Sequence, residues 1–99
     1  MIVVITAEAE ADLERIGDKI AEISPARAKN FLRELRQCSD GLTDMPERFS
    51  LVPHYEHTGV RRRPYGNYLI FYRVGIETID ILHVLHGAMD YEHLLFPKG

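Results

Sequence analysis

Apolar residues recur at helical spacing along the first half of the chain. After a β-branched run at residues 2–5, an apolar residue falls every three or four positions over residues 7–23, and the same period returns over residues 25–44. Thr6 and Ser24 precede the two segments, and both side chains suit a helix cap. The pattern predicts a strand buried on both faces, followed by two helices that a short break makes antiparallel.

The second half of the chain has the pattern of strands and turns. Residues 46–59 carry two prolines and no clear period, which indicates a connecting loop. Three runs with the pattern of strands follow this loop. The middle run is apolar on both sides, so we expect it at the centre of a sheet. Glycines at Gly66 and Gly75 favour hairpin turns between the runs. The predicted strands are residues 60–63, Tyr68–Val74 and residues 78–85.

This order of elements predicts an α+β fold. It comprises an N-terminal strand, an antiparallel helical hairpin and a mainly antiparallel three-stranded sheet, in the order β-α-α-β-β-β. The pattern leaves open whether the first strand joins at an edge or beside a later strand. Residues 1–99 suffice for one hydrophobic core, so we expect a single domain. Near the end, Asp90 is expected to cap a short helical turn that returns the last apolar residues to the body.

Positive charge is concentrated in one segment of an otherwise acidic chain. The formal net charge is −3, yet residues 60–74 hold four of the 12 basic residues and no acidic one. On a strand, Arg61 and Arg63 share one face and Arg62 takes the other, while Arg73 joins either group according to register. We interpret the four arginines as a surface for anionic groups, either a phosphate backbone or acidic side chains of a partner. The alternative is a charged edge strand that prevents aggregation.

The histidines do not predict a metal site. His54 and His57 stand in the predicted loop, and His83 and His86 would point to opposite faces of a strand. Neither spacing makes a good chelate without further ligands, and the lone cysteine, Cys38, falls in a predicted helix. We therefore expect no metal and no cofactor. A single cysteine also excludes a disulfide within the chain.

One further group of residues can carry chemistry. His86 ends the last predicted strand, and Tyr91 and His93 follow shortly after, so the three are candidates for proton transfer. The alternative is a hydrogen-bond network that completes the end of the strand. No P-loop, dinucleotide fingerprint, GxSxG or zinc-finger spacing occurs. The first apolar run is too short for a signal peptide and no run has the length of a membrane span, so we expect a cytoplasmic protein.

Four stretches give the chain a family resemblance. TAEAEADLERIGDKIAE, ISPARAKNFLRELRQC, VRRRPYGNYLIFYRV and IDILHVLHGAMDYEHLL resemble toxins of the ParE/RelE superfamily from bacterial type II toxin–antitoxin modules, nearer the ParE branch. The resemblance covers nearly the whole chain and implies the small α+β toxin fold. It also implies a cognate antitoxin as partner, ParD-like or another DNA-binding protein, whose acidic or amphipathic arm would meet the arginines.

The resemblance implies two different activities. ParE-like toxins inhibit DNA gyrase, whereas RelE-like toxins are ribosome-dependent endoribonucleases that need cations and proton-transfer groups near the RNA 2′-hydroxyl. Ala88 and Met89 stand where such nucleases often have a basic residue. If the chain is a nuclease, the resemblance implies as site residues Arg61, Arg63, Arg73, His86 and Tyr91.

We therefore expect a gyrase inhibitor that does not bind nucleic acid directly or associate with membranes. Its target-binding or partner-binding residues would be Arg61, Arg62, Arg63 and Arg73. The alternatives are a ribosome-dependent mRNA endoribonuclease and a degenerate toxin that only binds its antitoxin.

Overall fold

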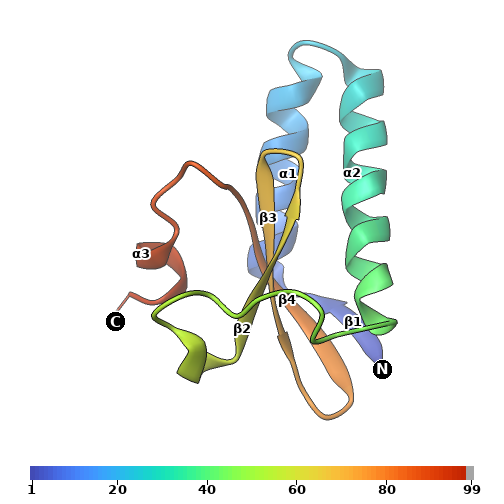
Figure 1. Ribbon diagram of the computed structural model, residues 1–99. Coiled ribbons are helices and arrows are strands. Elements are labelled where there is room, and N and C mark those ends of the chain that lie inside the picture. Colours follow the sequence, from blue (N-terminus) through green and yellow to red (C-terminus); the bar gives the residue numbers. More distant parts are fainter. Residues whose placement is uncertain (98–99) are drawn as a thin grey trace.

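The computed structural model describes residues 1–97 and contains a four-stranded sheet (Figure 1). The strands lie in the order β1-β4-β3-β2, with β3 antiparallel to both of its neighbours and β1 parallel to β4. The α+β fold and its three consecutive antiparallel strands are thus confirmed, and the first strand takes the edge beside the last. The strands are β1 (Ile2–Ile5), β2 (Val60–Tyr65), β3 (Tyr68–Val74) and β4 (Thr78–His86).

Two long helices form an antiparallel hairpin on one face of the sheet, α1 (Ala7–Ala21) and α2 (Pro25–Asp40) (Figure 1). Both predicted caps are present, because the Thr6 hydroxyl accepts from the backbone N–H of the first turn of α1, and that of Ser24 does the same for α2. The α2 helix ends before the expected residue 44, where the chain tightens into the 3₁₀ turn η1 (Gly41–Thr43). Within the described residues, no helix combines the length and apolar character needed to cross a membrane.

A glycine brings the two helices together. A Cβ built at Gly17 would lie 2.8 Å from Cδ1 of Leu32, so any larger residue at this position would meet α2. Beneath the helices, their apolar stripes and the sheet form the main core. Its largest fully buried side chains are Tyr72, Leu35, Leu42, Ile70, Ile79 and Ile81.

The opposite face of the sheet has a smaller core of its own. Phe71 and Leu85 are buried there, under the loop that contains η2 (Glu56–Thr58) and the C-terminal segment that contains α3 (Glu92–Leu95). Figure 1 shows α3 on the side of the sheet away from the helical hairpin. The central strand β3 is therefore covered on both faces. The expected return of the last apolar residues is confirmed for Leu95 and Phe96, whereas Leu94 stays half exposed.

Three further details of the sequence prediction are wrong. The strand β1 is not buried on both faces, since Ile2 is 69% and Val4 41% exposed, because an edge strand gains cover only from the helices. The strand β2 runs on to Tyr65, so the turn consists of Gly66 and its successor alone, with Gly66 at φ 57°. Asp90 caps nothing. The α3 helix starts without a side-chain cap, and the Asp90 carboxylate lies beside a histidine one turn later.

Candidate functional site

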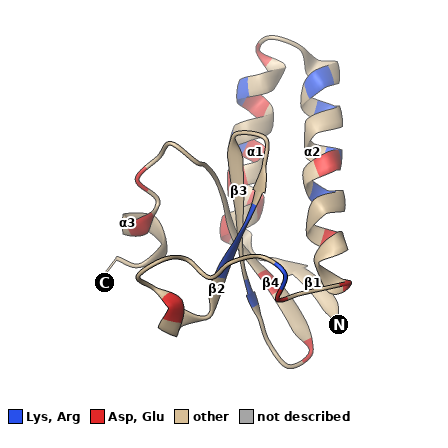
Figure 2. Ribbon diagram, viewed as in Figure 1, with Lys and Arg blue, Asp and Glu red and all other residues tan. Residues whose placement is uncertain are grey.

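The four arginines of the sheet lie on two different faces. Arg61 and Arg63 pair with β3 residues whose side chains enter the helix-side core. Arg62 pairs with Phe71 of the smaller core, and Arg73 lies two positions along β3 from Phe71, hence on that second face. Figure 2 shows these basic positions on the strands, separate from the basic residues along the helices. Register thus settles which group Arg73 joins, and the four do not form one surface.

Two of these arginines hold the preceding loop against β2. The Arg61 guanidinium donates to the backbone carbonyls of Glu47, at 3.2 Å, and Phe49, at 2.7 Å. Arg63 donates to the carbonyl of Pro64 at 2.6 Å, and its guanidinium lies 5.1 Å from the centre of the Phe49 ring. Both side chains are partly buried. They would give up existing contacts to bind a partner.

The third arginine anchors the C-terminal segment. Arg62 Nη1 donates to the Tyr91 hydroxyl at 2.8 Å, and the Tyr91 ring packs against Phe71 with 4.8 Å between ring centres. Tyr91, a candidate for proton transfer by sequence, therefore has a structural partner that orients it toward β2.

The proposed proton-transfer group does not come together. His86 is exposed and its Nδ1 accepts from the backbone N–H of Ala88 at 3.1 Å. His93 Nε2 lies 3.3 Å from Oδ2 of Asp90, with both side chains open to solvent. Within residues 1–97, no hydrogen bond or ring contact joins His86, Tyr91 and His93 to one another. In the same range, no group of three or more histidine, cysteine or acidic side chains is placed to bind a metal ion.

The fourth arginine differs from the others. Arg73 is exposed and has no hydrogen bond or ion pair in the described part of the chain. Asp80, its cross-strand neighbour on β4, instead accepts from the hydroxyl of Thr78 at 3.0 Å. Arg73 lines a cavity of about 380 Å³ on the second face, between the start of α1 and the C-terminal segment.

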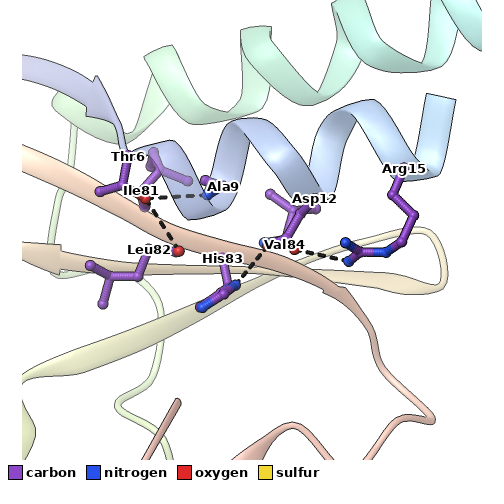
Figure 3. A network of polar contacts seen from close by, with 8 residues as sticks. All are labelled: Thr6, Ala9, Asp12, Arg15, Ile81, Leu82, His83 and Val84. Atoms are coloured by element: carbon purple, nitrogen blue, oxygen red, sulfur yellow. Dashed lines mark hydrogen bonds and ion pairs between the residues drawn. The ribbon is translucent and has the colours of Figure 1, made fainter. Parts of the chain in front are cut away.

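A histidine that sequence reasoning did not single out for chemistry lines the same cavity. His83 Nδ1 lies 2.7 Å from Oδ2 of Asp12, a carboxylate on α1 that is only 4% exposed. The same oxygen accepts from the backbone N–H of Val84 at 2.9 Å, and Oδ1 accepts from Arg15 at 2.8 Å. Figure 3 shows this network, with the second ring nitrogen of His83 directed away from Asp12.

The path of β1 explains why Asp12 is there. The strand β1 covers the edge of β4 only as far as Ile81, and the rest of that edge has no strand beside it. The Thr6 hydroxyl donates to the Ile81 carbonyl at 2.7 Å, and further along β4 Asp12 accepts from the N–H of Val84. Side chains of α1 thus continue the edge pairing that β1 begins.

The sequence contained a signal for this arrangement. Position 12 follows Ala9 by three residues and precedes Ile16 by four, so Asp12 lies on the buried stripe of α1. A carboxylate on an apolar stripe needs partners. The partners themselves lie some 70 residues further on, which periodicity does not reveal.

A larger cavity lies on the other side of the molecule. It has a volume of about 600 Å³ and lies between the second half of α2, the loop after it and β2. Its walls combine apolar groups of Met45 and Phe49 with the cations of Arg48 and Arg63 and with two carboxylates of the same region.

With both cavities placed, comparison with known proteins identifies the family. Residues 3–91 match the family described as ParE toxin of type II toxin–antitoxin system, parDE. This chain belongs to the ParE toxin family. Among curated ParE proteins, Toxin ParE1 of Mycobacterium tuberculosis, found in strains CDC 1551 and H37Rv, is 33% identical over 93 residues, which cover 92% of this chain and 94% of that protein.

Solved structures agree with the ParE assignment. A chain of the chromosomal ParDE system from P. aeruginosa superposes with a TM-score of 0.74 and 25% identity, over 87% of this chain and 95% of that chain. A chain of the toxin–antitoxin complex RelBE2 from Mycobacterium tuberculosis gives a TM-score of 0.62 and 25% identity, over 86% and 95%. The predicted superfamily, its ParE branch and its fold are confirmed.

Proposed function

We propose that this ParE-family toxin arrests growth by inhibiting DNA gyrase through protein contacts, and that a cognate antitoxin neutralises it. The observation that carries the proposal is the ParE family match over residues 3–91. The separation of His86, Tyr91 and His93 also favours docking over phosphoryl transfer, because acid–base catalysis needs such groups around one reacting atom.

Arg73 is the first residue that we assign to target binding. It is exposed and without a partner in the described chain, whereas Arg61, Arg62 and Arg63 each hold a segment of the fold. A guanidinium that loses no internal contact gains most from pairing with a carboxylate of a partner.

A supercoiling assay with purified gyrase tests the proposal. We expect the toxin to inhibit supercoiling, and Arg73→Ala to need about tenfold more protein for the same inhibition, because one charge-assisted contact is lost. Arg27→Ala is the matched control, since Arg27 is an exposed arginine at the start of α2, remote in sequence from the sheet. Full supercoiling at saturating wild-type toxin would refute gyrase inhibition.

The antitoxin half of the proposal has its own test. The larger cavity beside α2 offers apolar and cationic groups to an amphipathic arm, and both solved neighbours come from toxin–antitoxin pairs. We expect the toxin to co-purify with the product of the adjacent gene when both are expressed from the native operon. Recovery of the toxin without that protein would contradict a stable complex.

A ribosome-dependent mRNA endoribonuclease is the second candidate, favoured by the likeness to the RelBE2 complex. Translation of a defined message with and without toxin, followed by mapping of cleavage sites, tests it. Toxin-dependent cuts that disappear with Arg73→Ala or Tyr91→Phe would establish the nuclease in place of the gyrase inhibitor. A toxin that only binds its antitoxin would produce neither result, and its expression alone would leave growth unchanged.

A further inference from the structure

We propose that the cavity lined by Arg73 and His83 receives a carboxylate side chain, with an apolar side chain beside it, from a protein partner. The inference rests on the proposed function only in that the partner is a protein. The cavity is otherwise defined by chemistry that the family match does not supply: a free guanidinium, an oriented imidazole and an apolar wall.

The polar groups available to a ligand are few. Both threonine hydroxyls at the cavity have internal acceptors, since Thr6 donates to Ile81 and Thr58 donates to the carbonyl of Tyr55 at 2.6 Å. Arg73 is then the side chain that can donate to a ligand, and the His83 ring offers a nitrogen that can accept.

The Asp12 carboxylate fixes the His83 ring. A carboxylate only accepts hydrogen bonds, so Nδ1 of His83 carries the proton between them. In that tautomer Nε2 is left to accept a hydrogen bond from a backbone N–H of the ligand, while Arg73 pairs with the carboxylate. Asp12 is itself held by the backbone of Val84 and by Arg15, so the ring has little rotational freedom. The imidazole is thus positioned before any ligand arrives, which lowers the entropic cost of binding.

The remaining wall is apolar and belongs to the C-terminal segment. Leu94, Leu95 and Phe96 line the cavity, and Leu94 is half exposed. An acidic residue followed or preceded by an apolar one would place its carboxylate on Arg73 and its neighbour on this wall.

A carboxylate suits this cavity better than a phosphate group does. Glu8 lines the same space, and its negative charge repels a dianion more strongly than a single carboxylate. The chain also carries a formal net charge of −3, which opposes the approach of a nucleic-acid backbone. A planar guanidinium matches a carboxylate with two parallel hydrogen bonds.

Nuclear magnetic resonance of the His83 imidazole in the full chain tests the proposal. We expect N-acetyl-Glu-Leu-amide to shift the ring signals in a saturable way, and N-acetyl-Gln-Leu-amide to bind about tenfold more weakly. Arg73→Gln should weaken binding of the glutamate peptide by about the same factor, whereas Arg27→Gln should leave it unchanged. Leu94→Gln should weaken both peptides, because it removes part of the apolar wall.

Each contrary outcome is decisive. Equal binding of the two peptides, or equal binding by wild type and Arg73→Gln, would overturn the proposal, as would the absence of any shift with wild type. Inorganic phosphate that shifts the His83 signals at lower concentration than the glutamate peptide would make this a phosphate site instead. The gyrase assay is independent of these measurements, so a failure there with peptide binding intact would refute the proposed target and leave the cavity assignment standing.

Discussion

Asp12 shows how much one side chain can determine in a small fold. It replaces the missing neighbour of β4, fixes the His83 ring and pairs with Arg15, all from a position with 4% exposure. A buried carboxylate is costly unless its partners satisfy it, and here each oxygen has at least one. Structure and candidate site therefore depend on the same residue.

The Asp12→Ala variant should lose about 3 kcal/mol of unfolding free energy, because the Val84 N–H and the His83 ring lose their acceptor in a buried place. Urea denaturation followed by circular dichroism measures this. Asp18→Ala, an exposed carboxylate on the same helix, should stay within about 0.5 kcal/mol of wild type. Similar losses in the two variants would mean that the Asp12 network does not contribute to stability.

Sequence could predict the residues of the sheet but not their partners. Alternation along β2 predicted that Arg62 faces away from Arg61 and Arg63, and the register confirms it. That Arg62 meets Tyr91 depends on the path of the C-terminal segment, which no local pattern contains. The same holds for His83, whose role is visible only once α1 and β4 are adjacent.

At the scale of elements, Gly17 of α1 lets the Leu32 side chain of α2 come close. A glycine within a helix costs about 1 kcal/mol relative to alanine, so its presence indicates a packing requirement. Sequence patterns predicted where both helices start, because Thr6 and Ser24 are recognisable N-cap residues. They placed the end of α2 too late, because its apolar period continues through the 3₁₀ turn at Leu42.

We expect Gly17→Val to lower the free energy of unfolding by about 2 kcal/mol, because its side chain would press on Leu32 of α2. Combining it with Leu32→Ala should cost less than the sum of the two single changes, by about 1 kcal/mol. Thermal unfolding of all four proteins gives this coupling. Gly41→Ala is the control, because a Cβ there meets nothing within 4 Å. Strict additivity would refute the close approach.

The C-terminal segment is an element held by side chains. Tyr91→Phe keeps the ring on Phe71 but removes the hydrogen bond from Arg62, worth about 1 kcal/mol, so the amides of α3 should exchange with solvent about fivefold faster. Hydrogen–deuterium exchange at Leu94 and Leu95 measures this effect. His93→Gln, a change at an exposed side chain of the same segment, should leave the rates unaltered. Unchanged exchange in Tyr91→Phe would mean that ring packing alone holds the segment.

At the scale of the whole molecule, two tyrosines on the helix side make stability depend on alkaline pH. Burial raises the pKa of Tyr72 above its ordinary value of 10.0, and its hydroxyl donates to the carbonyl of Pro46 at 2.7 Å. A hydrogen bond to the Glu34 carboxylate raises the pKa of the partly buried Tyr65 in the same direction. The folded chain therefore keeps protons that the unfolded chain releases above pH 10 or so.

The free energy of unfolding should accordingly be constant below pH 9 or so and fall as the pH rises through about 10 and beyond. Urea titrations at a series of alkaline pH values measure the slope. Tyr72→Phe should flatten it, whereas Tyr65→Phe should retain the part due to Tyr72. Equal slopes for Tyr72→Phe and wild type would show that other groups cause the alkaline loss.

The pairing of β1 with β4 also determines at which stage of synthesis the toxin can complete its fold. Ile2 pairs with Thr78, and Asp12 contacts His83. These contacts cannot form until the later residue of each pair has been synthesised. The contacts between α1 and α2 are local, so the helical hairpin can begin to form before β4 has been made. The cavity of Arg73 and His83 needs β4 and the segment beyond it. A nascent chain thus lacks this cavity until β4 and the segment that follows it have been synthesised.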